Sequence, residues 1–253
     1  MNQAKSVKIR NTMKNSKERH DFIWIVGLIS LFLVLWVFKI GELAAMSGFY
    51  FIGVISSLSI FYLGIFLTVK NPYKRGFAYL KESLNYIYTT VILFFIFAFI
   101  GFFFSENLRF LDEILRQIIT KTQGLNVLEM IDFIFFNNLQ VSFFGLFLGF
   151  FVGIFSFINV VSNGIVLGYV FSKLAEASRL NEFWRIFPHG IFELPAVFIS
   201  LALGMKLGMF LFTRARNYEL KRRIRASLLV FIFYVTPLLI IAAIIEGILI
   251  VFF

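Results

Sequence analysis

Two titratable residues stand at the start of a long apolar stretch in the last third of the chain. His189 and Glu193 belong to the sequence PHGIFELP at residues 188–195. Their spacing of four residues places both side chains on one face of a helix, about one turn apart. A histidine and a carboxylate in this arrangement could bind a metal ion, pass a proton or hold helices together. Ionisable groups inside a membrane are costly and are candidate functional residues.

Metal binding is the weakest of these hypotheses. Zinc sites take three or four ligands, yet the only other histidine is His20, near the N-terminus. A site would have to combine His189, Glu193 and Glu246. We therefore predict no metal and no cofactor. The sequence contains no recognisable catalytic triad, phosphate-binding loop or glycosidase carboxylate pair, so we do not expect an enzyme.

The composition excludes an ordinary soluble protein. Of 253 residues, 60% are hydrophobic and 15% charged, and the mean hydropathy is +0.88. These values predict an all-α, polytopic bundle of transmembrane helices. There is no cysteine, so disulfides and thiolate metal sites are excluded. The formal charge of +10 comes mostly from residues that flank apolar runs. We expect those residues to face anionic lipid, and we expect no nucleic-acid partner.

About seven membrane segments are expected from the apolar runs. They cover residues 22–40, 48–69, 84–104, 139–158, 160–176, 189–212 and 227–251. A run of about 20 apolar residues can cross the hydrocarbon core. The fifth segment has a short apolar centre, and two interpretations stay open: a tilted span or a re-entrant arm.

The charge distribution predicts the orientation. Basic residues cluster in the tail 1–21 and in 70–81 and 214–225, which together hold 16 of the 24. The positive-inside rule places these clusters in the cytoplasm. Residues 105–138 carry five acids against three bases and are expected outside. We therefore predict a plasma-membrane protein with a cytoplasmic N-terminus and an external C-terminus. Residues 139–176 would form a hairpin whose inner turn contains Asn159, Asn163 and Gly164.

The outer stretch 105–138 contains an amphipathic pattern. Apolar residues recur at helical spacing between charged ones, and residues 122–124 interrupt the pattern; the apolar set is Leu108, Leu111, Ile114, Leu115, Ile118 and Ile119. This indicates a helix that lies on the membrane or on the bundle. It is either a connector or a docking surface for a partner.

Small residues at four-residue spacing predict where helices pack closely. The predicted contact residues are Gly145, Gly149, Gly153, Gly164, Gly168, Ala196, Ser200, Gly204 and Gly208. Pro195 and Pro237 fall within spans and are expected to kink them. The stripe from Ala196 to Gly208 lies close to the helix face of Glu193, so Glu193 should point into the bundle.

Several polar residues are expected at a similar depth in the outer half of the predicted spans, where they would form one layer. At 1.5 Å per residue, Glu193 lies about 6 Å below the outer end of its helix, and Glu246 lies at a similar depth in the last helix. Asn137 and Asn138 precede the fourth segment on the same side. The predicted polar layer is Asn137, Asn138, His189, Glu193 and Glu246. It is either a structural cluster or an ion path. Lys206 lies on another face, in the inner half, and should extend inward.

The same residues carry a family resemblance. Asn137-Asn138, the glycine-rich run to Asn163-Gly164, the 188–195 sequence and Ile245-Glu246-Gly247 are similar to the pattern of the stage II sporulation protein M family. The resemblance covers about residues 84–253 and implies a five-span core. Residues 22–83 would then form an added two-helix hairpin after the tail 1–21.

The resemblance also suggests a role. In spore-forming bacteria the family member is a membrane scaffold that recruits wall-remodelling partners. We therefore expect a non-enzymatic scaffold that binds proteins in the membrane or on its outer face, with homo-oligomerisation left open. A channel or carrier that uses the polar layer is the alternative, and a membrane-embedded metalloenzyme is a weaker one.

Overall fold

The computed structural model describes residues 69–178 and 183–252, without the side chains of residues 183–189. Every regular element in these ranges is a helix. Residues 73–253 form one compact unit. The predicted tail 1–21 and the predicted segments 22–40 and 48–69 lie outside the described residues, apart from Val69.

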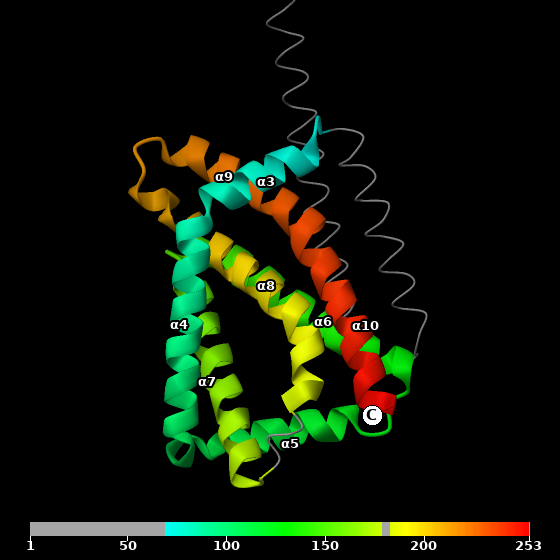
Figure 1. The fold of residues 1–253 in the computed structure, drawn as a ribbon. Coiled ribbons are helices and arrows are strands. Elements are labelled where there is room, and N and C mark those ends of the chain that lie inside the picture. The colour runs from blue at the N-terminus through cyan, green and yellow to red at the C-terminus, as the bar shows by residue number, and fades with distance from the viewer. Residues whose placement is uncertain (1–68, 179–182, 253) are drawn as a thin grey trace, which may run out of the picture. The chain divides into compact units, whose positions relative to one another are not determined.

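Five helical segments in the described ranges are long and apolar enough to cross a membrane. They are Leu84–Phe103, Val127–Phe150, Ile154–Glu176, Gly190–Phe212 and Arg216–Phe252. In Figure 1 these segments run alternately up and down between two ends of the bundle. The prediction of a polytopic helical membrane protein is confirmed, and the described part supplies five of the expected segments.

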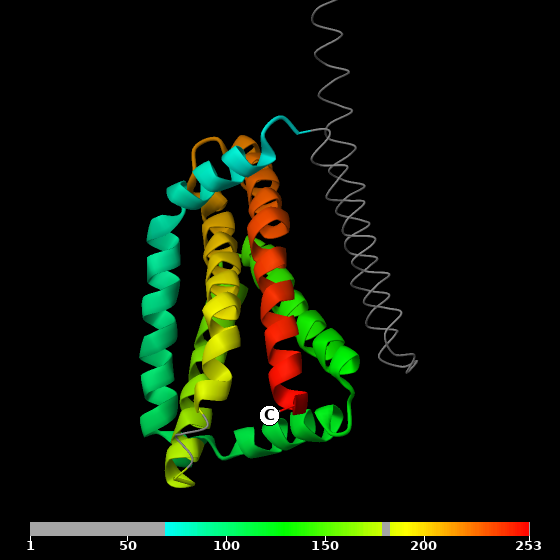
Figure 2. The same ribbon diagram turned by 45° about the vertical axis from the view of Figure 1, so that its right-hand side comes forward.

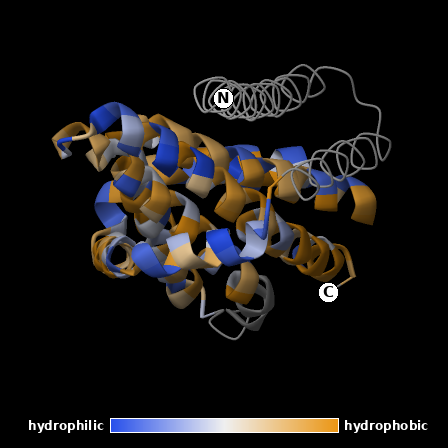
Figure 3. Ribbon diagram, turned by 90° about the horizontal axis from the view of Figure 1, so that it is seen from above, coloured by the Kyte–Doolittle hydropathy of each residue, from blue (hydrophilic) through white to orange (hydrophobic). Residues whose placement is uncertain are grey.

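Two helices at one end join the spans. Helix α3 (Pro72–Glu82) leads into α4 (Leu84–Phe103), and α9 (Arg216–Val230) begins at the same end. Pro72 suits the first position of α3 because its fixed φ matches the helix and its missing N–H is not needed there. The two basic clusters in the described ranges fall in and beside α3 and α9, so both lie at this end. Figure 3, a view from above, shows hydrophilic residues between the hydrophobic stretches of the ribbons.

The amphipathic stretch crosses the opposite end of the bundle. A 3-10 turn (Ser105–Leu108) precedes α5 (Phe110–Thr122), which runs below the spans in Figure 2. The helix lies where the periodicity predicted it and ends before Gly124, whose φ is +82°. Asn126 and Glu129 then form a capping box with two 3.0 Å hydrogen bonds, which starts α6 (Val127–Phe147).

The turn between the fourth and fifth predicted segments lies earlier than expected. Helix α6 continues into a 3-10 turn (Leu148–Phe150), and α7 (Ile154–Glu176) begins after Gly153, which has a left-handed φ of 75°. Asn159, Asn163 and Gly164 were predicted at this turn but lie within α7. The glycine-rich 149–153 run makes the turn because glycine tolerates the left-handed backbone. With 23 residues, α7 is long enough to span the membrane.

The last two spans contain the in-span prolines. Helix α8 (Phe183–Gly208) continues through Pro195 and ends in a 3-10 turn (Met209–Phe212). Helix α9 passes through a π-helical turn (Phe231–Val235) into α10 (Thr236–Phe252), so the final span starts before the predicted residue 227. Next to Pro237, the Thr236 hydroxyl donates a 3.0 Å hydrogen bond to the carbonyl of Phe231. This π-helical turn ends just before Pro237, whose missing N–H interrupts the α-helical hydrogen-bond ladder.

Small residues allow the closest helix contacts. A Cβ at Gly168 would overlap the carbonyl oxygen of Ala98, so α7 and α4 touch backbone to backbone. On the other side of the bundle, Gly204 of α8 lies against Gly149, and Gly208 lies against Gly153. Between these contacts, Phe94, Val160, Val197, Phe198 and Leu201 form a buried apolar cluster. Packing of this kind stabilises helices in lipid, where burial from water contributes little.

Candidate functional site

Three helices contribute to the predicted polar layer. The side-chain amide of Asn138 on α6 is the hydrogen-bonding partner of the Glu193 carboxyl on α8. Glu246 on α10 lies close enough to Glu193 to interact with it electrostatically. Asn137 is a neighbour of this group through a 3.4 Å contact between its amide nitrogen and the Asn138 side-chain oxygen. The structure thus brings together four of the five predicted residues, while the side chain of His189 lies outside the described residues.

The position of the layer differs from the prediction in one respect. Asn137 and Asn138 do not precede the fourth span but lie in the middle of α6, because that helix begins at Val127. The same shift brings Asp132 into the span. Its neighbour Ile131 packs against Gly247, the residue after Glu246. The capping sequence Asn126–Glu129 was the signal that could have located this helix start.

Asn159 and Asn163 form a separate local pair. The Asn163 amide donates to the Asn159 carbonyl at 2.9 Å and to its side-chain oxygen at 3.1 Å. Among the described residues, no hydrogen bond links this pair to Asn138 or Glu193. No group of three His, Asp or Glu residues in the described ranges is placed to hold a metal ion.

A second charged site, absent from the sequence analysis, lies where α3 and α9 meet α8. The Lys206 ammonium, with a side chain only 5% exposed, is 3.0 Å from the Glu82 carboxylate. It also donates to the Ser83 hydroxyl at 3.0 Å and lies 4.0 Å from the centre of the Tyr79 ring. Lys206 does extend toward its own end of the bundle, as expected, but it reaches a carboxylate there.

Arginines of α9 complete this site. Arg222 forms two 2.9 Å hydrogen bonds to Glu82 and a 3.0 Å ion pair with Glu219. Arg223 pairs with Glu219 at 3.2 Å and donates to the backbone carbonyl of Lys206. We call Glu82, Lys206, Glu219, Arg222 and Arg223 the Lys206 cluster. It joins α3, α8 and α9 through charge-assisted hydrogen bonds.

Two residues of α3, in and beside the Lys206 cluster, have shifted pKa values. The hydrogen bonds from Arg222, supported by Lys206, lower the pKa of Glu82 from 4.5 to about 2. Burial raises the pKa of Tyr79 to about 12, so its ring remains neutral beside Lys206. A sequence signal existed: Glu82 and Glu219 are the only acids within 70–83 and 214–225.

Together these features define a helical, multi-span integral membrane protein with ionisable groups inside its bundle. Residues 90–249 match the stage II sporulation protein M family, and the chain belongs to that family. The match begins in α4, so Glu82 and the rest of α3 lie outside it. The chain is also similar to an uncharacterized protein of Methanocaldococcus jannaschii, 28% identical over 191 residues, covering 71% of this chain and 84% of the relative. No solved structure matches the chain.

Proposed function

We propose that the protein is a non-enzymatic scaffold of the cell membrane that binds partner proteins through α5. The observation that carries this proposal is the exposed apolar surface of that helix. Phe110 and Ile119 are 64% and 63% exposed, and Ile114 and Ile118 are also exposed, whereas Leu111 is the buried residue of the helix. An amphipathic helix that leaves most of its apolar residues uncovered is suited to bind a partner.

A contact near the start of α5 ties this surface to the bundle. Near the start of the helix, Asp112 accepts a 2.6 Å hydrogen bond from the Tyr169 hydroxyl of α7. Beyond its C-terminal end, the Asn126–Glu129 capping box begins α6. The bond to α7 and the short connection into α6 favour a pre-organised α5, which would reduce the binding energy that a partner loses to ordering the helix.

The proposed orientation places α5 outside the cell. The described basic clusters lie at the α3 and α9 end, and the positive-inside rule assigns that end to the cytoplasm. With an odd number of spans from α4 to α10, the C-terminus then lies outside. Partner proteins would be membrane-bound or external, and a second copy of the chain is one such partner.

Photo-crosslinking tests the scaffold proposal. A benzoyl-phenylalanine at Ile119 of α5 should give a discrete protein adduct in cells. The matched control is Ile92, which is 60% exposed on α4. The adduct should disappear when Ile114→Asn is added to the same chain. Equal adducts at both positions, or adducts that survive Ile114→Asn, would contradict docking on α5.

Transport through the polar layer is the alternative function. It is favoured by two carboxylates, Glu193 and Glu246, that interact across two membrane helices. The test is proton or cation flux into proteoliposomes, measured for the unmodified protein and for Glu193→Gln and Glu246→Gln. Flux that both substitutions abolish would support transport. Absence of flux above empty vesicles would leave Glu193 and Glu246 as structural groups.

A further inference from the structure

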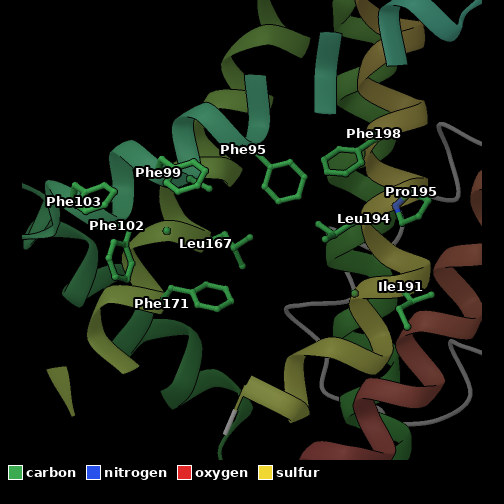
Figure 4. Close-up of a pocket in the computed structure, with 13 residues that line it drawn as sticks. Phe95, Phe99, Phe102, Phe103, Leu167, Phe171, Ile191, Leu194, Pro195 and Phe198 are labelled. Carbon is green, nitrogen blue, oxygen red and sulfur yellow. The ribbon is translucent and has the colours of Figure 1, made fainter. Parts of the chain in front are cut away.

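A wide apolar cavity separates α8 from the α4–α7 pair. Its volume is about 690 Å³, and it is lined by residues of the three helices (Figure 4). Phe95 projects from α4 toward Phe198 of α8, and Leu194 of α8 faces Leu167 of α7 across the space (Figure 4). Among the residues that the structure describes, no lining residue carries a titratable or hydrogen-bonding side chain.

The walls of the cavity are held apart by packing elsewhere in the bundle. Helix α7 already touches α4 at Gly168 and Ala98, so these two helices cannot approach further. Helix α8 meets α4 through an edge-on contact of Phe94 with Phe198, whose ring centres are 5.0 Å apart. Because Phe198 is buried and also lines the cavity, this contact forms one boundary of it. The space therefore cannot be closed by a small movement of one helix.

The cavity opens on the surface of the spans. Phe99, Phe103 and Ile191 are 64%, 71% and 52% exposed. The described lining residues all belong to the candidate membrane-crossing segments. The medium at this opening is thus the hydrocarbon of the bilayer.

We infer that the cavity binds an acyl chain of a bilayer phospholipid. Water would find no hydrogen-bonding partner on these side chains. An empty space would leave the aromatic walls without dispersion contacts. A hydrocarbon chain would supply the dispersion contacts that the wall side chains need. The volume also lies within the roughly 300–1,000 Å³ of small-molecule sites. The inference is independent of the scaffold proposal, because no residue of α5 lines the cavity.

The test uses the full-length protein in nanodiscs that contain a phosphatidylglycerol with a diazirine in its acyl chain. After illumination, label should concentrate on peptides containing residues 95–103 and 190–198. The comparison peptide contains Ile154 and Ile158, which are 54% and 52% exposed on α7. Labelling in proportion to exposure over all spans would overturn the inference.

Two substitutions that fill the cavity sharpen the test. Among the described side chains, a Cβ at Gly190 would meet only Leu194, at 4.0 Å, so Gly190→Leu is expected to enter the cavity without a clash. Leu167→Phe fills it from the opposite wall. Either change should remove label from residues 95–103. Ile92→Phe, at an exposed α4 position outside the lining, should leave the label unchanged.

If protein and not an acyl chain filled the cavity, the labelling experiment would give a different result. A crosslink that joins two copies of the chain, or an unlabelled cavity in the unmodified protein, would show that protein fills the space and would overturn the inference. If one filling variant does not fold, the other variant and the label map of the unmodified protein decide the outcome.

Discussion

The Lys206 ammonium group lies 3.0 Å from a carboxylate oxygen of Glu82, and the two residues belong to α8 and α3. Glu82 also binds Arg222 of α9. One carboxylate therefore connects three helices at one end of the bundle, and it comes from a helix that lies outside the residues matched to the family. A helix that precedes the matched residues thus completes a charge cluster with α8 and α9.

Glu82→Gln is expected to destabilise the protein by about 1–2 kcal/mol. This is less than the loss of a fully buried pair, because the Glu82 side chain is 44% exposed while that of Lys206 is 5% exposed. Thermal unfolding in detergent measures the effect. Glu106→Gln is the matched control, since its partner Arg109 and Glu106 itself are both exposed. An equal shift in both variants would contradict a special role for Glu82.

Stability should depend on pH through the same carboxylate. The Arg222 hydrogen bonds lower the pKa of Glu82 from 4.5 to about 2 in the folded protein. Its contribution is therefore complete above about pH 4.5 and is lost as the pH falls toward 2. The difference in melting temperature between the unmodified protein and Glu82→Gln should shrink over this range. A constant difference between pH 6 and pH 2 would show that ionised Glu82 is not the cause.

Gly168→Ala is expected to disrupt the α4–α7 contact and to cost about 1–3 kcal/mol. The added methyl group would meet the backbone of Ala98, which cannot move aside as a side chain could. Gly190→Ala is the control, because Leu194, at 4.0 Å, is the one described side chain near that position. That change should be neutral or stabilise α8 by up to about 1 kcal/mol through helix propensity. Unfolding curves of the two variants decide between these outcomes.

The proposed orientation can be tested with cysteines, because the chain has none. Lys221→Cys on α9 should react with a membrane-impermeant maleimide only after the cells are opened. Lys121→Cys on α5 should react in intact cells. The reverse pattern would invert the orientation and place the α5 surface in the cytoplasm.

Local sequence patterns were sufficient to predict the helices and many of the contacts between them. The length and hydropathy of the apolar runs predicted spans, the spacing of Leu111 and Ile114 predicted α5, and small residues such as Gly149 and Gly168 marked close approaches. These features depend on residues a few positions apart. The turn was misplaced because Gly149 and Gly153 serve both as packing residues and as turn formers, and spacing alone does not distinguish these uses.

Partner choice between distant helices required the tertiary structure. Whether Glu193 meets Asn138, and whether Lys206 meets Glu82, depends on how each helix is rotated and on where α3 crosses the bundle. Hydrophobic periodicity reports which face of a helix is apolar, but it does not say which other helix lies against that face. His189 and Glu193 were assigned to one polar layer from the sequence. Although Glu82 and Glu219 stand alone among basic residues in the sequence, only the packing of α3, α8 and α9 shows which basic residues they meet.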